Sequence, residues 1–189
     1  MLNPQFWWYL ARASGIVAWV LLTASTLLGI LLSTRLLKPF DRPAWLLDLH
    51  RWLSTLTIFS VGLHLAALVA DSYVHFGVAD LLVPLASDWR PLAVAWGVVA
   101  MYLLVVVQAS SLLMKKLPKK LWRGIHFASY AIFVSVSIHS LTAGTDKGVA
   151  FFQALAVVLV TLMVAFTAVR LVYTGKPRTR QVLPAPQRD

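Results

Sequence analysis

Long runs without a charged residue divide the chain. Five such runs cover residues 13–34, 52–70, 91–114, 124–145 and 148–169. A helix needs about 20 mostly apolar residues to cross the hydrocarbon core of a bilayer. Because apolar residues are continuous within each run and do not alternate with polar ones, the runs predict helices and not barrel strands. The pattern therefore predicts an all-α, polytopic membrane protein with five transmembrane helices.

The composition supports this class and excludes several others. Hydrophobic residues make up 59% of the 189 residues and charged residues 13%, which is too apolar for a small soluble domain or for a disordered chain. The chain has no cysteine, which excludes disulfides, cysteine-ligated zinc, iron–sulfur clusters and covalently attached c-type haem. We expect one transmembrane domain over residues 1–174 and a flexible, basic cytoplasmic tail over residues 175–189.

Basic residues predict the orientation in the membrane. Fourteen of the 17 lysines and arginines fall in segments 35–51 and 115–123 and after residue 169, whereas only Arg12, Arg90 and Lys147 fall on the other side. Positive loops stay in the cytoplasm. We therefore expect a multi-pass protein of the cell membrane with its N-terminus outside and its C-terminus in the cytoplasm. The net charge of +10 then requires no nucleic acid, because anionic lipid headgroups or an acidic partner protein explain it equally well.

Four of the five histidines belong to the second and fourth predicted helices. His50 and His64 are 14 residues apart, and His126 and His139 are 13 apart, so each spacing corresponds to about 20 Å of helix rise. A titratable side chain inside a bilayer is costly and by default suggests function. At about 100° per residue, a step of 13 turns about 140° away from the starting face, so His126 and His139 do not share one face of an ideal helix.

Neighbouring acidic residues indicate that the histidines match in depth. His64 lies seven residues before Asp71, and His139 lies seven residues before Asp146, at corresponding ends of two parallel helices. We therefore expect one histidine pair near each membrane face. The fifth, His75, lies in the outer loop, where it is either a solvated residue or a contact for a metal ion or an acceptor.

Paired imidazoles across a helix bundle can ligate a haem iron axially. Such a site needs cations for the haem propionates, and the candidates at suitable depth are Arg12, Arg51 and Arg123. It also needs small residues at close approaches, and Gly62 and Gly124 lie near histidines in the sequence. We therefore expect the five helices to be bundled around haem.

At these residues the chain resembles the ferric reductase-like transmembrane domain family. The matching segments are LHRWLSTLTIFSVGLH (49–64), WRGIHFASYAIFVSVSIH (122–139) and ARASG (11–15). The resemblance implies two b-type haems, an inner one on His50 and His126 and an outer one on His64 and His139. It also implies that electrons move from the cytoplasmic side to an extracytoplasmic acceptor, which can be ferric iron, oxygen or a partner reductase.

Two features differ from many members of that family. We count five helices where many members have six, and the sequence has no Gly-rich dinucleotide fingerprint. We therefore expect a separate flavoprotein or a quinol to supply the electrons. The basic segment Lys115–Lys120 either docks such a partner or only determines topology.

Two other classes of function compete with this interpretation. A metal-ion transporter or metal-binding membrane protein would use the histidines with acidic or amide groups inside the bilayer. The predicted spans contain no Asp, Glu or Asn, and Gln108 and Gln153 lie outside the histidine-bearing helices. A structural subunit would use the histidines only for hydrogen bonds between helices.

Overall fold

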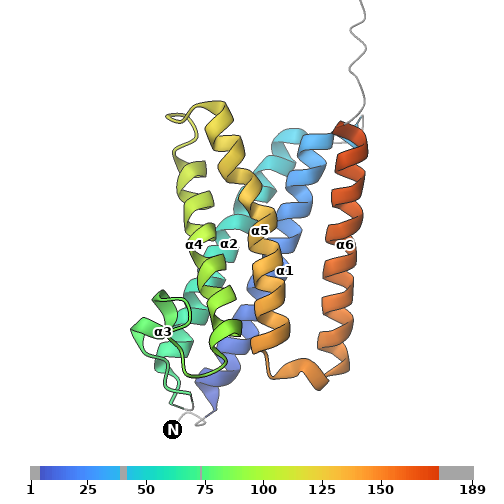
Figure 1. Ribbon diagram of the computed structural model, residues 1–189. Coiled ribbons are helices and arrows are strands. Elements are labelled where there is room, and N and C mark those ends of the chain that lie inside the picture. Colours follow the sequence, from blue (N-terminus) through green and yellow to red (C-terminus); the bar gives the residue numbers. More distant parts are fainter. Residues whose placement is uncertain (1–4, 39–41, 73, 175–189) are drawn as a thin grey trace, which may run out of the picture.

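The computed structural model describes residues 5–38, 42–72 and 74–174, and the predicted tail lies outside them. All regular structure in these residues is helical: α1 (Phe6–Thr34), α2 (Pro43–Ala70), α3 (Val78–Leu82), α4 (Pro91–Leu112), α5 (Lys119–Ala143), the 3₁₀-helix η1 (Asp146–Gly148) and α6 (Ala150–Thr174) (Figure 1). Five of these helices are long and apolar enough to cross a membrane. The predicted all-α class and the five spans are therefore confirmed.

The five long helices run alternately up and down (Figure 1). The start of α1, the α3 segment and η1 lie at one end of the bundle, which we call the α3 end. The opposite end, which we call the basic end, contains the end of α1, the start of α2 and the loop from α4 to α5. His50 and His126 lie toward the basic end of their helices, and His64 and His139 lie toward the α3 end.

Helices α1, α2 and α5 begin before the charge-free runs that predicted them. Proline occupies the first turn of α2 and of α4, where its missing N–H costs no helical hydrogen bond. Because α2 begins at Pro43, His50 and Arg51 lie within the helix. Helix α1 ends where Arg35 adopts a left-handed conformation and donates its N–H to Leu31 O, an ordinary helix termination.

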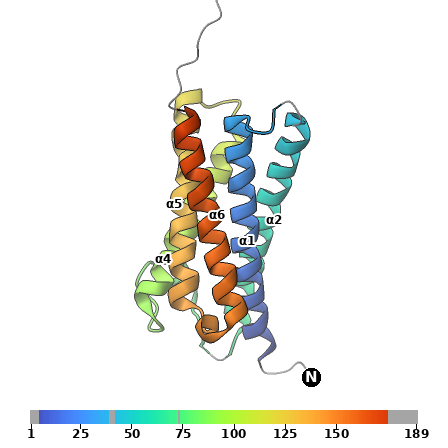
Figure 2. The same cartoon turned by 90° about the vertical axis from the view of Figure 1, so that its right-hand side faces the viewer.

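Helix α1 forms the centre of the bundle. The fully buried Trp19 packs with Phe133, Phe152 and Met163, which joins α1 to α5 and α6. A second cluster joins Leu22 to residues of α4 and α5. Helices α1 and α2 pack along each other, as do α4 and α5, but α2 and α5 do not pack closely (Figure 2). The two histidine-bearing helices therefore face each other across a space between two helix pairs.

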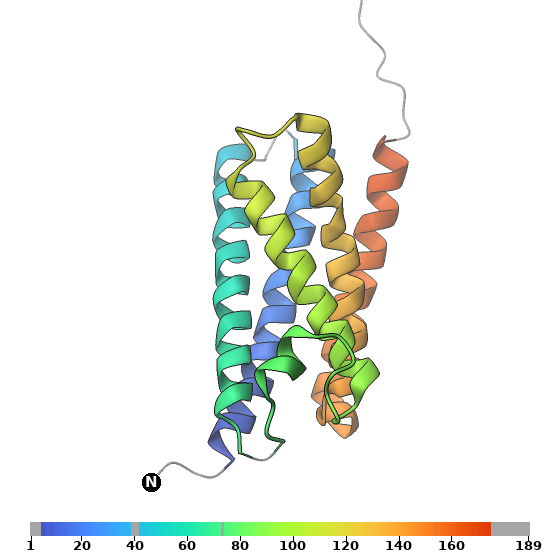
Figure 3. The same cartoon turned by 60° about the vertical axis from the view of Figure 1, so that its left-hand side comes forward.

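The loop before α4 folds back on the bundle. Phe76 and Leu81 pack against Val94 and Val98 of α4, and α3 lies beside the start of α4 (Figure 3). This segment covers the α3 end of the space between the helix pairs. Figure 3 also shows that α4 is inclined relative to the upright α2 and slopes away from it toward the α3 end.

Candidate functional site

Two pairs of imidazoles meet between α2 and α5. The ring centroids of His50 and His126 are 6.1 Å apart, with an angle of 66° between the rings. Those of His64 and His139 are 6.4 Å apart at 83°. Both predicted pairings are therefore present in the geometry, although the 13-residue step would put His126 and His139 on different flanks of an ideal helix.

The separation within each pair suits two axial ligands on one metal. An imidazole nitrogen binds a first-row metal at about 2.0–2.1 Å, and it lies about 1.1 Å from the ring centroid, so two trans imidazoles have centroids about 6.3 Å apart. The observed 6.1 and 6.4 Å bracket this value. Each pair is therefore spaced so that two imidazoles would hold one metal between them, as a haem iron would require.

Backbone carbonyls fix the tautomer of three of the rings. His64 Nδ1 lies 2.7 Å from Ala11 O, His139 Nδ1 lies 2.8 Å from Ala93 O, and His50 Nδ1 lies 2.8 Å from Ser25 O. Because a carbonyl oxygen only accepts, Nδ1 must carry the proton and donate it. The lone pair is then on Nε2, which is the arrangement of metal-ligating histidines.

Glycines on the neighbouring helices make room for these rings. A Cβ at Gly97 would lie 2.8 Å from atoms of the His139 ring, and one at Gly15 would lie 3.1 Å from His64 Nδ1. A Cβ at Gly29 would make an ordinary contact of 3.6 Å with His50. Gly62 and Gly124, which the sequence suggested, have no other heavy atom within 4 Å of such a Cβ and are exposed. The glycines that matter are therefore on α1 and α4.

The three glycines share one arrangement. Gly15, Gly29 and Gly97 each follow, by four residues, the residue whose carbonyl accepts from the imidazole. In a helix, that carbonyl lies directly beneath the side-chain position four residues later. Because glycine has no side chain at that position, the imidazole can reach the carbonyl oxygen, which also accepts the hydrogen bond within the helix.

His126 departs from the arrangement. Ser111 of α4 stands where the other three sites have glycine: its Oγ donates to Val107 O at 2.8 Å and lies 3.4 Å from His126 Nδ1. The serine hydroxyl thus stands between the imidazole and the carbonyl, and the contact to the ring is long for a hydrogen bond. Trp122 stacks on a face of this imidazole, with ring centroids 5.2 Å apart at 27°.

A mainly apolar cavity surrounds the His64–His139 pair. It contains about 1310 Å³ of space between protein atoms, its mouth included, and both imidazoles, Gly15 and Gly97 line it. Cofactor pockets are typically apolar clefts with a few directed polar groups. This lining therefore suits a large apolar group held by its two histidines.

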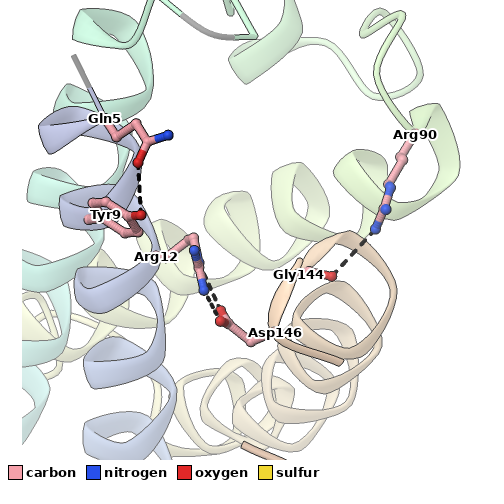
Figure 4. A network of polar contacts seen from close by, with 6 residues as sticks. All are labelled: Gln5, Tyr9, Arg12, Arg90, Gly144 and Asp146. Atoms are coloured by element: carbon pink, nitrogen blue, oxygen red, sulfur yellow. Dashed lines mark hydrogen bonds and ion pairs between the residues drawn. The ribbon is translucent and has the colours of Figure 1, made fainter. Parts of the chain in front are cut away.

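Arg12 reaches the rim of this cavity. Its guanidinium forms an ion pair with Asp146 of η1, with Nε 2.9 Å from Oδ2 (Figure 4), and both residues line the cavity. The pair ties the start of α1 to the connection between α5 and α6. Arg12 is thus the one predicted propionate partner that lies on the His64–His139 cavity.

Arg90 links the start of α4 to the end of α5 at the same end of the bundle. It caps α4, and its Nη1 donates to the carbonyls of Thr142 and Ala143 at 2.9 and 3.1 Å. The same atom donates to the Gly144 carbonyl at 3.4 Å (Figure 4). A cation at a helix C-terminus also interacts favourably with the helix dipole. Since Ala93 and Gly97 follow Arg90 on α4, this contact sets the register of α4 against His139.

The other predicted residues lie at more exposed places. Arg51 is exposed and bonds Asp48 one turn away at 3.2 Å, and Arg123 is also exposed, near the start of α5. Their roles as propionate partners stay predictions. His75 is exposed, has a positive φ of 56° and does not line the His64–His139 cavity, so its role stays a prediction too.

Sequence reasoning did not select three residues near His126. These are Ser111, Trp122 and Arg170, whose guanidinium lies 4.8 Å from the Phe127 ring and donates to Tyr130 Oη at 3.1 Å. The position of Trp122 four residues before His126, which puts both on one helix face, was a usable signal. Ser111 and Arg170 belong to other helices, so they required the fold.

The described residues hold no group of three or more His, Cys, Asp or Glu side chains that could bind a bare metal ion. They offer pairs of imidazoles instead. The competing structural interpretation, hydrogen bonds between helices, accounts for the Nδ1 atoms but gives no role to the Nε2 atoms.

Comparison with known proteins identifies the family. The family model described as ferric reductase like transmembrane component matches residues 14–137. The matched range includes three of the four paired histidines and all three supporting glycines. No curated protein and no solved structure matches the chain. Because the matched range covers more than half of the sequence, the chain belongs to the ferric reductase-like transmembrane component family.

Proposed function

We propose that the chain is a membrane electron-transfer protein that holds two b-type haems, one between His50 and His126 and one between His64 and His139. The observation that carries the proposal is the pair of centroid distances, 6.1 and 6.4 Å, which suit axial ligation twice. When bound, the haems supply one-electron redox chemistry, and the protein determines where and at what potential it occurs.

The chain's own residues would hold and orient the cofactors. The Nδ1 bonds to Ala11, Ser25 and Ala93 keep the Nε2 lone pairs available and raise the basicity of the ligands. The apolar cavity around His64 and His139 excludes water. Arg12 uses its Nε and Nη2 atoms on Asp146, and we propose that its remaining N–H groups bind a propionate carboxylate.

We further propose that the basic end lies in the cytoplasm and the α3 end outside. Lysines of the segment 115–120 and arginines of the α1–α2 connection gather at the basic end, which supports this orientation through the positive-inside rule. The donor would then be a cytoplasmic flavoprotein or a quinol that serves the His50–His126 site. The acceptor would be extracytoplasmic: ferric iron, oxygen or a partner reductase.

The first test is haem content in the detergent-purified chain. Dithionite-reduced minus oxidised spectra with a pyridine haemochrome assay should give two b-type haems per chain. His64→Ala should lose one, and the double variant His64→Ala/His139→Ala should lose no more, because both residues serve one site. His50→Ala/His64→Ala should lose both haems.

His75→Ala is the matched control, since it removes an exposed histidine outside both pairs and should keep two haems. Absence of haem from chains produced with ample haem supply would refute the proposal. If His75→Ala lost haem while the substitutions at the four paired histidines did not, the proposed pairings would be refuted.

Orientation can be tested separately because the chain has no cysteine. In intact cells, a membrane-impermeant maleimide should label Lys147→Cys but not Lys116→Cys. The reverse pattern would place the basic end outside.

A further inference from the structure

One buried polar atom near the His50–His126 pair has no partner. Trp122 Nε1 is buried and makes no hydrogen bond. Indole N–H is a donor only, and burial of a donor without an acceptor is unfavourable. By contrast, the fully buried Trp19 donates its Nε1–H to Ser137 Oγ at 3.2 Å. The chain therefore supplies a hydrogen-bond acceptor for the Trp19 N–H, whereas the Trp122 N–H is free to donate to a bound molecule.

The position of this indole suggests what it binds. Trp122 stacks on His126, with ring centroids 5.2 Å apart, and His126 faces His50 at 6.1 Å. Because the indole lies 5.2 Å to the side of this imidazole, its N–H would be displaced from the centre of a haem held there toward the edge of the ring system. At that edge, a b-type haem carries two propionate carboxylates, which are strong acceptors for N–H donors.

The local charge also favours an anion. Arg170 of α6 lies over the Phe127 ring and bonds Tyr130, so a half-buried cation adjoins the same stretch of α5. No Asp or Glu occurs between Lys119 and Ala143. A carboxylate near Trp122 would therefore meet one donor and a favourable electrostatic environment.

We propose that Trp122 Nε1–H donates a hydrogen bond to a propionate carboxylate of the haem held by His50 and His126, an inference that rests on the proposed function. Trp122 is thus a cofactor-binding residue of this site. A hydrogen bond to a propionate spreads its negative charge and so favours the reduced haem. Loss of the bond should lower the midpoint potential of this haem alone.

The test is a redox titration of the full-length holoprotein carrying Trp122→Phe, which keeps a stacking ring and removes the N–H. We expect two haems per chain, one unchanged potential and one potential lower by about 59 mV, which is a tenfold change in the ferrous-to-ferric ratio of a one-electron couple. Trp52→Phe is the matched control, because Trp52 lies two residues from His50 but is 68% exposed and should leave both potentials unchanged.

Two further measurements keep the test decisive. Trp122→His restores an N–H donor and should return the potential toward that of the wild type. If Trp122→Phe loses the haem, retention of that haem in Trp122→His supports the proposal, and equal loss in both variants overturns it. After reconstitution with haem dimethyl ester, whose propionates are uncharged esters and so weaker acceptors, the difference in potential between wild type and Trp122→Phe should shrink.

Unchanged potentials in Trp122→Phe, with two haems bound, would overturn the proposal. If such a variant were instead reduced more slowly by a quinol, the indole would bind a quinol oxygen and not a propionate. A wild-type chain without haem would refute the proposed function itself, which distinguishes that failure from this one.

Discussion

Gly97→Ala should remove the haem between His64 and His139 while leaving the fold intact. A Cβ at this position would lie 2.8 Å from both Cε1 and Nδ1 of His139, whereas ordinary contacts begin near 3.4 Å. The imidazole must therefore withdraw by about 0.6 Å, since an sp³ carbon and a ring atom have their optimum separation at about 3.5–4.0 Å. Withdrawal also stretches the 2.8 Å bond from Nδ1 to Ala93 O.

Both effects act on His139, a proposed ligand of this haem. Disturbance of a group that orients a ligating histidine typically reduces metal affinity by about 10–100-fold. Alanine is at the same time the better helix former by about 1 kcal/mol, so the helix itself gains from the substitution. The expected result is one haem per chain by pyridine haemochrome assay, with unchanged helical content by circular dichroism.

A series of glycine substitutions makes this test quantitative. The built Cβ distances are 2.8 Å at Gly97, 3.1 Å at Gly15 and 3.6 Å at Gly29, and no atom lies within 4 Å at Gly62 or Gly124. Haem loss on substitution by alanine should follow that order, with Gly29→Ala close to wild type. Gly62→Ala and Gly124→Ala are controls, because they replace a helix glycine by alanine where no imidazole is near. Two haems in Gly97→Ala, or haem loss in Gly62→Ala, would refute the reasoning.

Three other predictions follow from contacts at the two ends of the bundle. Ser111→Ala removes the hydroxyl that contacts His126 Nδ1, so the imidazole becomes less basic and one midpoint potential should rise. Ser111→Gly exposes the Val107 carbonyl to the imidazole and should lower that potential. Equal shifts in one direction would contradict this reasoning. Arg12→Met and Asp146→Asn should show a coupling energy of about 0.5–3 kcal/mol in a double-mutant cycle of thermal stability, because the two groups form one ion pair; additive effects would exclude it. Arg90→Ala should cost about 1.5–3 kcal/mol of stability through its lost carbonyl bonds, and Arg90→Lys should cost less, which denaturation in detergent can measure.

The membrane spans could be predicted because the absence of charge over about 20 residues is a property of the sequence itself. The histidine pairings could be predicted for a related reason: His64 and His139 are each seven residues from an aspartate that ends a span, so depth could be counted along the chain. Depth alone does not give the rotation of a helix. The 13-residue step between His126 and His139 suggested different flanks, and only the packing of the inclined helices brings both rings to α2.

The supporting glycines were missed because nearness in sequence was used in place of nearness in space. Gly62 is two residues from His64, and on a helix two residues are about 200° apart, so the glycine faces away. A better signal was present in the sequence. Gly15 and Gly29 are 14 residues apart, as are His50 and His64. In antiparallel neighbours of equal rise, two such pairs meet in reverse order, Gly15 with His64 and Gly29 with His50, as the contacts show.

The second helix pair, α4 and α5, has the same spacing, with one irregular site at His126. Fourteen residues after Gly97 comes Ser111, which faces His126 as Gly29 faces His50. The two helix pairs therefore use one design, in which an imidazole donates to a carbonyl and the residue four positions later must be small. Serine satisfies the size requirement but places a hydroxyl in front of the carbonyl, so His126 receives a long contact in place of a direct one. The two proposed ligand pairs thus differ in the hydrogen bonding of one imidazole, His126, because of a single side chain.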